Sequence, residues 1–173
     1  MEEVKNSIIC FHNPDEENGY LSNWFRSDFI IDGIKFSSAE QYMMYQKALV
    51  FDDFDTAGKI LKTDDVREIK SLGRQVKNYD ENTWSGLRQV VVYNGLLEKF
   101  RQNEDLAYKL LNTNGTFAEC AVKDTIWGIG LSMTDENRFD KSKWKGQNLL
   151  GYSLVCVRKQ IAVEYLATTG FKG

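Results

Sequence analysis

Glu40 and Lys47 are the two residues of this sequence whose types and spacing most clearly suit chemistry. They lie in the segment 37–47, Ser-Ser-Ala-Glu-Gln-Tyr-Met-Met-Tyr-Gln-Lys, which is typical of a helix that begins after a serine cap. Seven positions make two helical turns with a drift of about 20°. Both side chains therefore project from one face, roughly 10 Å apart along the axis. A carboxylate and an amine placed in this way can converge on one small molecule.

The same segment has a structural interpretation. Ser37-x-x-Glu40 and Ser38-x-x-Gln41 both match a capping box, in which the third residue returns to the backbone at the helix start. Lys47 then becomes a solvated surface residue. The spacing alone favours this interpretation over an active site.

A second group of residues lies in the segment 124–130, Asp-Thr-Ile-Trp-Gly-Ile-Gly. Gly128 and Gly130 permit positive φ or a close backbone approach. Asp124 can anchor such a turn or accept a ligand hydroxyl, and Trp127 can stack on a base or a sugar. A lone Gly-x-Gly is weak evidence of phosphate binding, so these residues by themselves favour a turn with a core tryptophan.

Three further segments can bind parts of a nucleotide. Asn23 and Trp24 combine an amide that can read a base or ribose edge with a ring that can stack. Arg74 follows Gly73 at a helix end, where it either reaches a phosphate or satisfies the helix C-terminus. The segment 145–151 places backbone amides at a helix N-terminus, which is a favourable anion site. None of these segments decides the function alone.

Composition excludes several classes of protein. Lys plus Arg number 22 and Asp plus Glu 25, a net charge of −3, so a general coat on DNA or RNA is not expected. Three separated cysteines and the single His12 form no disulfide framework or zinc pattern. We expect no metal and no cofactor. No apolar run or signal peptide indicates a membrane, and we expect a cytoplasmic protein.

The elements that would position these residues are mostly helical. Hydrophobic residues make up 42% of the chain, and the expected fold class is α+β, predominantly helical, as one compact domain over 1–173 with a core of about 8–162 and a frayed tail at 166–173. The expected strands are 7–11 and 116–122, with a hairpin over 29–36 around Asp32-Gly33. The expected helices are one that Ser37 or Ser38 caps and that runs to about residue 50, then 51–61, 64–72 after a Thr63 cap and before Gly73, one that Asp80 or Asn82 opens and that runs to about residue 101, 104–111 after Asn103, and one from Gln147 or Asn148. The apolar stripe expected in 82–101 is Trp84, Leu87, Val91, Leu96, Leu97 and Phe100, and the last helix turns Leu150, Leu154, Val157 and Ile161 inward.

Together and in this order, these segments resemble the YbiA/NADAR family over about residues 8–162. The matching residues are Leu-Ser-Asn-Trp (21–24), Asp-Gly (32–33), Ser-Ala-Glu-Gln-Tyr (38–42), Gln-Lys (46–47), Leu-Gly-Arg (72–74), Trp84, Lys-Phe (99–100), Leu-Leu-x-Thr (110–113), Glu119, Asp-x-x-Trp-Gly-x-Gly (124–130), Gly-x-Asn-x-Leu-Gly (146–151) and Arg158.

The resemblance implies a mostly helical N-glycosidase. Some family members cleave phosphorylated ribosylamino-pyrimidine intermediates of riboflavin synthesis, and others remove ADP-ribose from guanine bases in nucleic acid. The family often has His where this chain has Gln41, and Phe where it has Trp24. These departures bear on substrate detail more than on the type of reaction.

The resemblance also implies roles for the candidate residues. Glu40 becomes the acid/base group near the anomeric carbon, and Asp124 holds ribose hydroxyls or orients water. Lys47 either binds phosphate or protonates the leaving base as an ammonium, or attacks the opened ribose as a neutral amine. The remaining assignments are base or ribose contacts for Asn23, Trp24 and Trp127, phosphate contacts for Arg74, Gly128 and Asn148, pocket wall or core for Trp84, and second carboxylate or surface residue for Glu119.

Three functions follow as hypotheses. The first is removal of ADP-ribose from guanine, with modified DNA or RNA contacted only locally. The second is hydrolysis of ribosylated riboflavin intermediates. The third is a nucleotide-binding module without catalysis, which the pairing of Glu40 with Lys47 disfavours because binding alone does not require both. The acidic balance slightly favours a small substrate or one flipped nucleotide over extended duplex contact.

Overall fold

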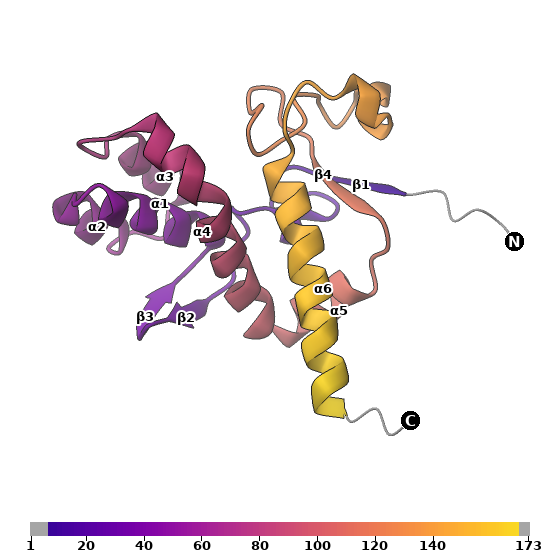
Figure 1. Cartoon of the computed structure of the whole chain (residues 1–173), viewed down its shortest axis with the longest axis horizontal. Helices are drawn as coiled ribbons and strands as arrows, with labels where there is room; N and C mark the ends of the chain where they lie inside the picture. The colour runs from indigo at the N-terminus through magenta and orange to yellow at the C-terminus, as the bar shows by residue number, and fades with distance from the viewer. Residues whose placement is uncertain (1–6, 170–173) are drawn as a thin grey trace, which may run out of the picture. The chain divides into compact units, whose positions relative to one another are not determined.

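The structure is a computed structural model that describes residues 7–169. Its contacts divide the described residues into two compact units, unit 1 from residues 7–22 and 104–169, and unit 2 from residues 23–103. Helices dominate both units, with a few short strands (Figure 1). The predicted α+β, mainly helical class is confirmed, whereas the single domain over 1–173 stays a prediction.

Unit 2 begins with a short antiparallel hairpin. Strands β2 (Phe29–Ile31) and β3 (Ile34–Phe36) pair through the register Phe29 to Phe36. Asp32 and Gly33, between the strands, have φ of 51° and 79°, which is the backbone of a type I′ turn. The Asp-Gly prediction is therefore confirmed. Phe29 and Phe36 are buried and pack with Tyr42 of the following helix.

Four helices complete unit 2, namely α1 (Ala39–Val50), α2 (Phe54–Ile60), α3 (Val66–Arg74) and α4 (Glu81–Arg101). The other three all pack against α1. Two glycines permit this close packing. A Cβ on Gly73 of α3 would lie 2.0 Å from Met44 Sδ, and one on Gly95 of α4 would lie 2.5 Å from Tyr42 Cδ1.

The caps of these helices agree with the sequence except at α3. Ser38 and Asp80, each one of the two caps considered for its helix, cap α1 and α4 through side-chain oxygens. The predicted Thr63 cap of α3 is wrong, because Asp65 accepts from the N–H groups of its first turn. Gly73 lies inside α3 instead of ending it.

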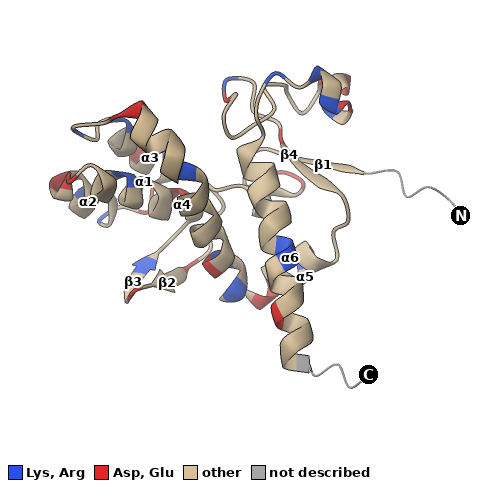
Figure 2. Cartoon of the chain, viewed as in Figure 1, with Lys and Arg blue, Asp and Glu red and all other residues tan. Residues whose placement is uncertain are grey.

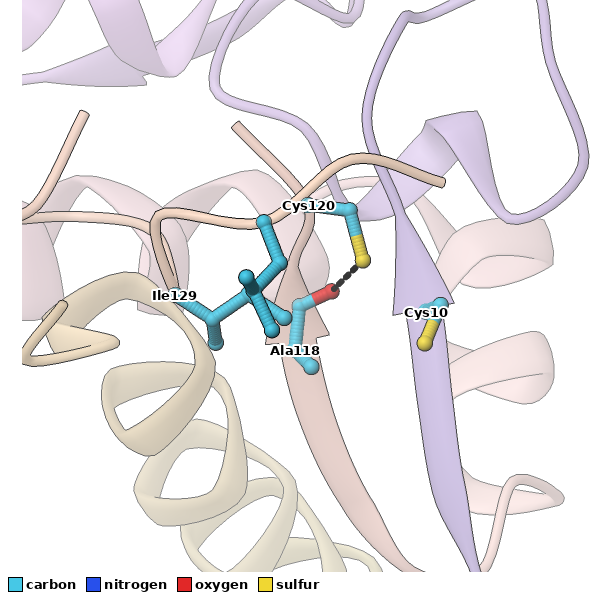
Figure 3. Packing of buried hydrophobic residues seen from close by; sticks show 5 residues of the cluster. Cys10, Ala118, Cys120 and Ile129 are labelled. Atoms are coloured by element: carbon cyan, nitrogen blue, oxygen red, sulfur yellow. Dashed lines mark hydrogen bonds between the residues drawn. The ribbon is translucent and has the colours of Figure 1, made fainter. Parts of the chain in front are cut away.

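Unit 1 combines strands and helices from both ends of the chain. Its elements are β1 (Ile8–Phe11), the 3₁₀ turns η1 (Gly19–Leu21), η2 (Glu136–Phe139) and η3 (Lys141–Lys143), α5 (Glu104–Leu111), β4 (Thr116–Glu119) and α6 (Leu149–Thr169). Strands β1 and β4 pair in parallel, with Cys10 opposite Ala118. Figure 3 shows Cys10 and Ala118 packed with Cys120 and Ile129, a buried cluster that joins the two strands to the loop after β4.

Helix α6 packs on β4 and α5 through the predicted stripe. Its inward residues Leu150, Leu154, Val157 and Ile161 are all buried. The helix continues to Thr169, past the expected start of a tail at Leu166, and residues 170–173 lie outside the described part. Among the helices of residues 7–169, none has the length and apolar content needed to cross a bilayer.

The start of α1 is held by one buried glutamine, Gln41. Its Oε1 accepts from Ser37 N–H at 2.7 Å and Ser37 Oγ at 3.1 Å, and its Nε2 donates to the carbonyls of Ile60 at 3.0 Å and Thr63 at 2.8 Å. Its own N–H donates to Ser38 Oγ at 3.1 Å. Gln41 thus ties α1 to the segment between α2 and α3.

We expect Gln41→Met to lower the free energy of unfolding by about 2–4 kcal/mol, because it leaves the two carbonyls and the Ser37 N–H buried without their side-chain partner. Urea denaturation measures the change. Gln160→Met is the control, since the Gln160 amide of α6 makes one bond, to Glu164, on a partly exposed surface. Equal losses in the two variants would show that Gln41 contributes only ordinary helix packing.

Candidate active site

Glu40 and Asn23 lie next to each other in unit 2, at the first turn of α1. The Glu40 N–H donates to the Asn23 carbonyl at 2.9 Å. Both side chains are buried, with exposed fractions of 3% and 5%. The Asn23 Oδ1 has no hydrogen-bond partner within the described chain. An acceptor in this state is suited to a hydroxyl or N–H of a ligand.

Glu40 is not needed as a capping residue. The Ser37 N–H that a Ser37–Glu40 capping box would use is already bonded to Gln41 Oε1. Ser38 and Gln41 provide the cap instead. The capping interpretation therefore explains Gln41 and does not apply to Glu40.

Lys47 lies two turns further along α1 and is half-buried. Its Nζ donates to the Gly73 carbonyl at 2.8 Å and lies 4.3 Å from the ring centroid of Tyr79. Burial lowers the pKa of Lys47, whereas the negative charges of Glu81 and Glu40 oppose that shift. The amine is thus a positioned group and not the solvated surface lysine of the alternative interpretation.

The other candidates in unit 2 differ in their surroundings. Arg74 ends α3 and is exposed, and its charge also acts to lower the pKa of Lys47. Trp24 is half-buried, with Lys70 Nζ 5.3 Å from its ring centroid. Trp84 is buried in α4 with an exposed fraction of 5%, which agrees with the core interpretation and leaves its substrate role a prediction.

Sequence reasoning did not single out the polar cluster beside Lys47. Tyr79 donates a short hydrogen bond to Glu81, and Arg88 pairs with the same carboxylate at 3.1 Å. Arg88 is buried, with an exposed fraction of 8%. One sequence signal exists, because Arg88 follows Trp84 by four residues and so continues its buried helical face.

Lys99, one of the residues that carry the family resemblance, is a second buried basic side chain, and sequence reasoning gave it no role. Its exposed fraction is 0%, and burial lowers its pKa to about 7. Its Nζ lies 5.4 Å from the ring centroid of Phe25 and 5.3 Å from that of Phe100. Phe25 is two residues from Asn23, so Lys99 packs against the segment that meets the start of α1.

In unit 1, Asp124 anchors its own loop. Its Oδ1 accepts from the N–H groups of Ile126 at 3.0 Å and Trp127 at 2.8 Å. This is the turn-forming role considered for Asp124, and its role toward ribose hydroxyls or water stays a prediction. Trp127 is half-buried, and its role as a base or ribose contact stays a prediction.

Asn148 connects the start of α6 to strand β4. It is fully buried, and its Oδ1 accepts from Glu119 N–H at 3.1 Å while its Nδ2 donates to Phe117 O at 2.8 Å. Its backbone has φ of 53°. These bonds explain an asparagine here, because its amide serves a donor and an acceptor and it tolerates positive φ.

The anion site expected at the start of α6 is wrong. The backbone N–H groups of residues 147–150 donate to the carbonyls of Thr125, Gly128, Ile126 and Trp127, in that order, at 2.8–3.2 Å. The loop therefore caps the helix and leaves these amides no capacity for a phosphate. The substrate roles of Gly128, Asn148 and Glu119 stay predictions.

The structure thus gathers the candidates into two groups, one in each unit. Unit 2 holds Asn23, Trp24, Glu40, Lys47, Arg74 and Trp84, and unit 1 holds Glu119, Asp124, Trp127, Gly128 and Asn148. Basic and acidic residues are interspersed along the elements of both units (Figure 2). Across residues 7–169, no cluster of three or more His, Cys, Asp or Glu side chains is arranged to hold a metal ion.

Comparison with known proteins identifies the family. The NADAR domain model matches residues 10–162, which is most of the chain. The protein therefore belongs to the NADAR domain family.

Relatives of the chain have named activities or solved structures. It is 37% identical to N-glycosidase R617 of Acanthamoeba polyphaga mimivirus over 88% of this chain and 95% of that protein. It is 32% identical to riboflavin biosynthesis protein VVA0006 of Vibrio vulnificus, matching 88% of this chain but only 38% of that protein. The NMR structure of Escherichia coli YbiA superposes with a TM-score of 0.79 at 25% identity, over 98% of this chain and 94% of YbiA.

The buried Lys99 predicts a pH-dependent stability. Its native pKa of about 7 lies below the ordinary lysine value of 10.5, so between these values the unfolded chain binds more protons. The free energy of unfolding should rise with pH across that window, by up to about 1.4 kcal/mol per pH unit from this group.

Lys99→Met should remove this contribution, as measured by urea denaturation at several pH values from 7 to 10. Lys59→Met, at an exposed lysine of α2, should leave the slope unchanged. A Lys99→Met protein with the wild-type slope would show that Lys99 keeps an ordinary pKa in the folded chain.

Proposed function

We propose that the protein releases a base from a phosphorylated, nucleotide-like ribosyl substrate, and that this substrate is ADP-ribosylated guanine in nucleic acid. The broader class does not depend on this choice: as a NADAR family member related to a named N-glycosidase, the protein is a hydrolase of N-glycosyl bonds. The observation that carries the proposal is the buried Glu40 with the half-buried Lys47 two turns further along the same helix.

Glu40 suits the ribose side of the reaction. Breaking an N-glycosidic bond builds positive charge on the ribose and negative charge on the departing base. A buried carboxylate stabilises the first of these strongly, because little water screens it. Glu40 would also take a proton from the attacking water.

Lys47 suits two routes, and both return it to its starting state. As an ammonium it gives its proton to the departing base and recovers one afterwards. As a neutral amine it attacks the anomeric carbon, the electron pair of the broken bond leaves with the base, and the base takes up a proton. The opened ribose is then held as a Schiff base, which water hydrolyses to the sugar and the free amine. The lowered pKa of Lys47 supports the neutral form.

The remaining roles concern binding. Asn23, with its unpartnered Oδ1, would accept from a ribose hydroxyl or a base N–H, and Trp24 would stack beside it. Arg74 would contact a phosphate from the exposed end of α3.

A second substrate is favoured by one relative. The Vibrio vulnificus protein carries a riboflavin biosynthesis name, which supports a ribosylamino-pyrimidine phosphate as the substrate. The two substrates share a phosphorylated ribose attached through nitrogen to a heterocycle, so the chemistry of Glu40 and Lys47 is the same for both.

Substrate and catalysis are tested together by incubating the protein separately with ADP-ribosylated guanine DNA and with ribosylamino-pyrimidine phosphate, and measuring released base or ADP-ribose. We expect turnover of the first. Glu40→Gln should lower kcat by about 10²- to 10⁴-fold, because the amide cannot act as a base, while the unfolding temperature stays similar.

The control for Glu40→Gln is Glu104→Gln, at an exposed glutamate of α5, which should keep wild-type kcat. Faster turnover of the pyrimidine phosphate would select the second substrate. Turnover of neither would favour a binding module, and wild-type kcat in Glu40→Gln would remove the acid/base role.

Lys47→Arg tests whether the lysine takes a chemical part in the reaction, and borohydride trapping separates its two routes. Arginine keeps the positive charge but cannot lose its proton or form a Schiff base. We expect loss of turnover and loss of the adduct that borohydride traps between the wild-type protein and substrate, detected by intact mass. Lys59→Arg should retain both. An active Lys47→Arg enzyme would exclude both routes and argue for phosphate binding instead, whereas a wild-type protein that turns over substrate without a trapped adduct would argue for proton donation.

A further inference from the structure

Arg88 is a buried cation to which the proposed mechanism gives no role. It lies on the second turn of α4, one turn after Trp84, and its side chain is 10% exposed. Its Nη1 donates to Glu81 Oε1 at 3.1 Å. Its Nε has no hydrogen-bond partner among residues 7–169. Burying an N–H of a charged group without an acceptor lowers the stability of the protein. An oxygen of a ligand could supply the acceptor that this atom lacks.

Arg88 belongs to one cluster with Lys47. Glu81 accepts from Arg88 and from the Tyr79 hydroxyl, and the Lys47 Nζ lies over the Tyr79 ring at 4.3 Å. The charge of Glu81 acts on Lys47, as does that of Arg74. Two basic side chains, Arg88 and Lys47, therefore act on Glu81, and Glu40 is the other carboxylate that acts on Lys47. Among Lys47, Arg88 and the Glu81 between them, two positive charges meet one negative charge, which suits an anion.

Because the buried cation is an arginine, the class of anion that it can bind is restricted further. Glu81 occupies Nη1, and the unpartnered atom is Nε, so the side of the guanidinium group that carries Nε–H is the one to be filled. A guanidinium group matches the oxygen spacing of a phosphate, and it cannot lose its charge on burial. Glu81 is 59% exposed on its side chain, so it can turn toward water when an anion approaches.

We propose that Arg88 binds a phosphate oxygen of the substrate through Nε–H, next to Lys47, with Glu81 as the internal counter-ion that the phosphate partly replaces. This inference rests on the proposed function for its choice of a phosphorylated ribose. The binding itself is independent of catalysis, because the phosphate takes no part in breaking the N-glycosidic bond.

The test compares ribose 5-phosphate, inorganic phosphate and ribose as ligands in calorimetric titrations. The wild-type protein should bind ribose 5-phosphate more tightly than ribose. Arg88→Lys keeps the charge but lacks the Nε–H, and it should weaken ribose 5-phosphate binding by about 10- to 100-fold without changing ribose binding. With substrate, KM should rise by a similar factor while kcat stays near the wild-type value.

Two further variants sharpen the result. Arg101→Lys changes an arginine of the same helix that pairs with Glu98 on a more exposed surface, and it should bind ribose 5-phosphate like the wild type. Glu81→Gln removes the negative charge of the counter-ion and leaves Arg88 itself unchanged. It should tighten ribose 5-phosphate binding, since Arg88 then has no internal competitor.

The outcomes separate this inference from the proposed function. Unchanged ribose 5-phosphate binding in Arg88→Lys, or weaker binding in Glu81→Gln, overturns the phosphate role even if the enzyme turns over its substrate. Tight, Arg88-dependent binding in a protein that turns over neither substrate supports the site and rejects the N-glycosidase assignment. Equal weakening with inorganic phosphate and ribose 5-phosphate shows that the phosphate group alone is recognised, as proposed.

Discussion

The arrangement of unit 2 depends on the hydrogen bonds of one buried amide, Gln41. An amide has two donors and two acceptor positions, and here they join the start of α1 to Ser37 and to the carbonyls of Ile60 and Thr63. A carboxylate could not replace it, because Glu has no donor for the two carbonyls. Because Gln41 makes the hydrogen bonds of the cap, the adjacent Glu40 is not required there. Glu40 is buried beside Asn23.

Local signals predicted most of the elements but misjudged the buried face of α4. Asp-Gly at the hairpin and the serine and aspartate caps act within a few residues, so the sequence contains all the information they need. The expected stripe used apolar residues alone and included Leu87, which is 42% exposed. The buried face instead includes Arg88 and Lys99, together with Trp84 and Gly95 at helical spacing. Hydrophobicity cannot identify a face on which cations are buried for function or packing.

Contacts between distant parts of the chain could not be predicted in the same way. Strand β4 pairs with β1 across more than a hundred residues, and parallel pairing has no local turn signal. The segment 145–151 was predicted to be an anion site because its own residues look like a helix start. The carbonyls that cap it come from residues 125–128, and a sequence pattern does not show which oxygens reach a helix terminus. Asn148 was therefore correctly selected as a special residue, with a structural explanation that its pattern did not contain.

The buried polar groups of this protein divide by whether the chain satisfies them. Gln41 and Asn148 have their side-chain amides bonded to the chain's own backbone, and so they explain the fold without a ligand. Asn23 Oδ1 and Arg88 Nε lack a hydrogen-bond partner among residues 7–169. Each is an atom to which a nucleotide could supply a partner, a hydroxyl or N–H for Asn23 and a phosphate oxygen for Arg88. Arg138 Nε also lacks an oxygen partner, but its charge acts on the thiol of Cys10, whose pKa is lowered first by a hydrogen bond from Cys120 and also by Arg138. Because burying a polar atom without a partner costs stability in the free protein, such atoms persist where binding uses them.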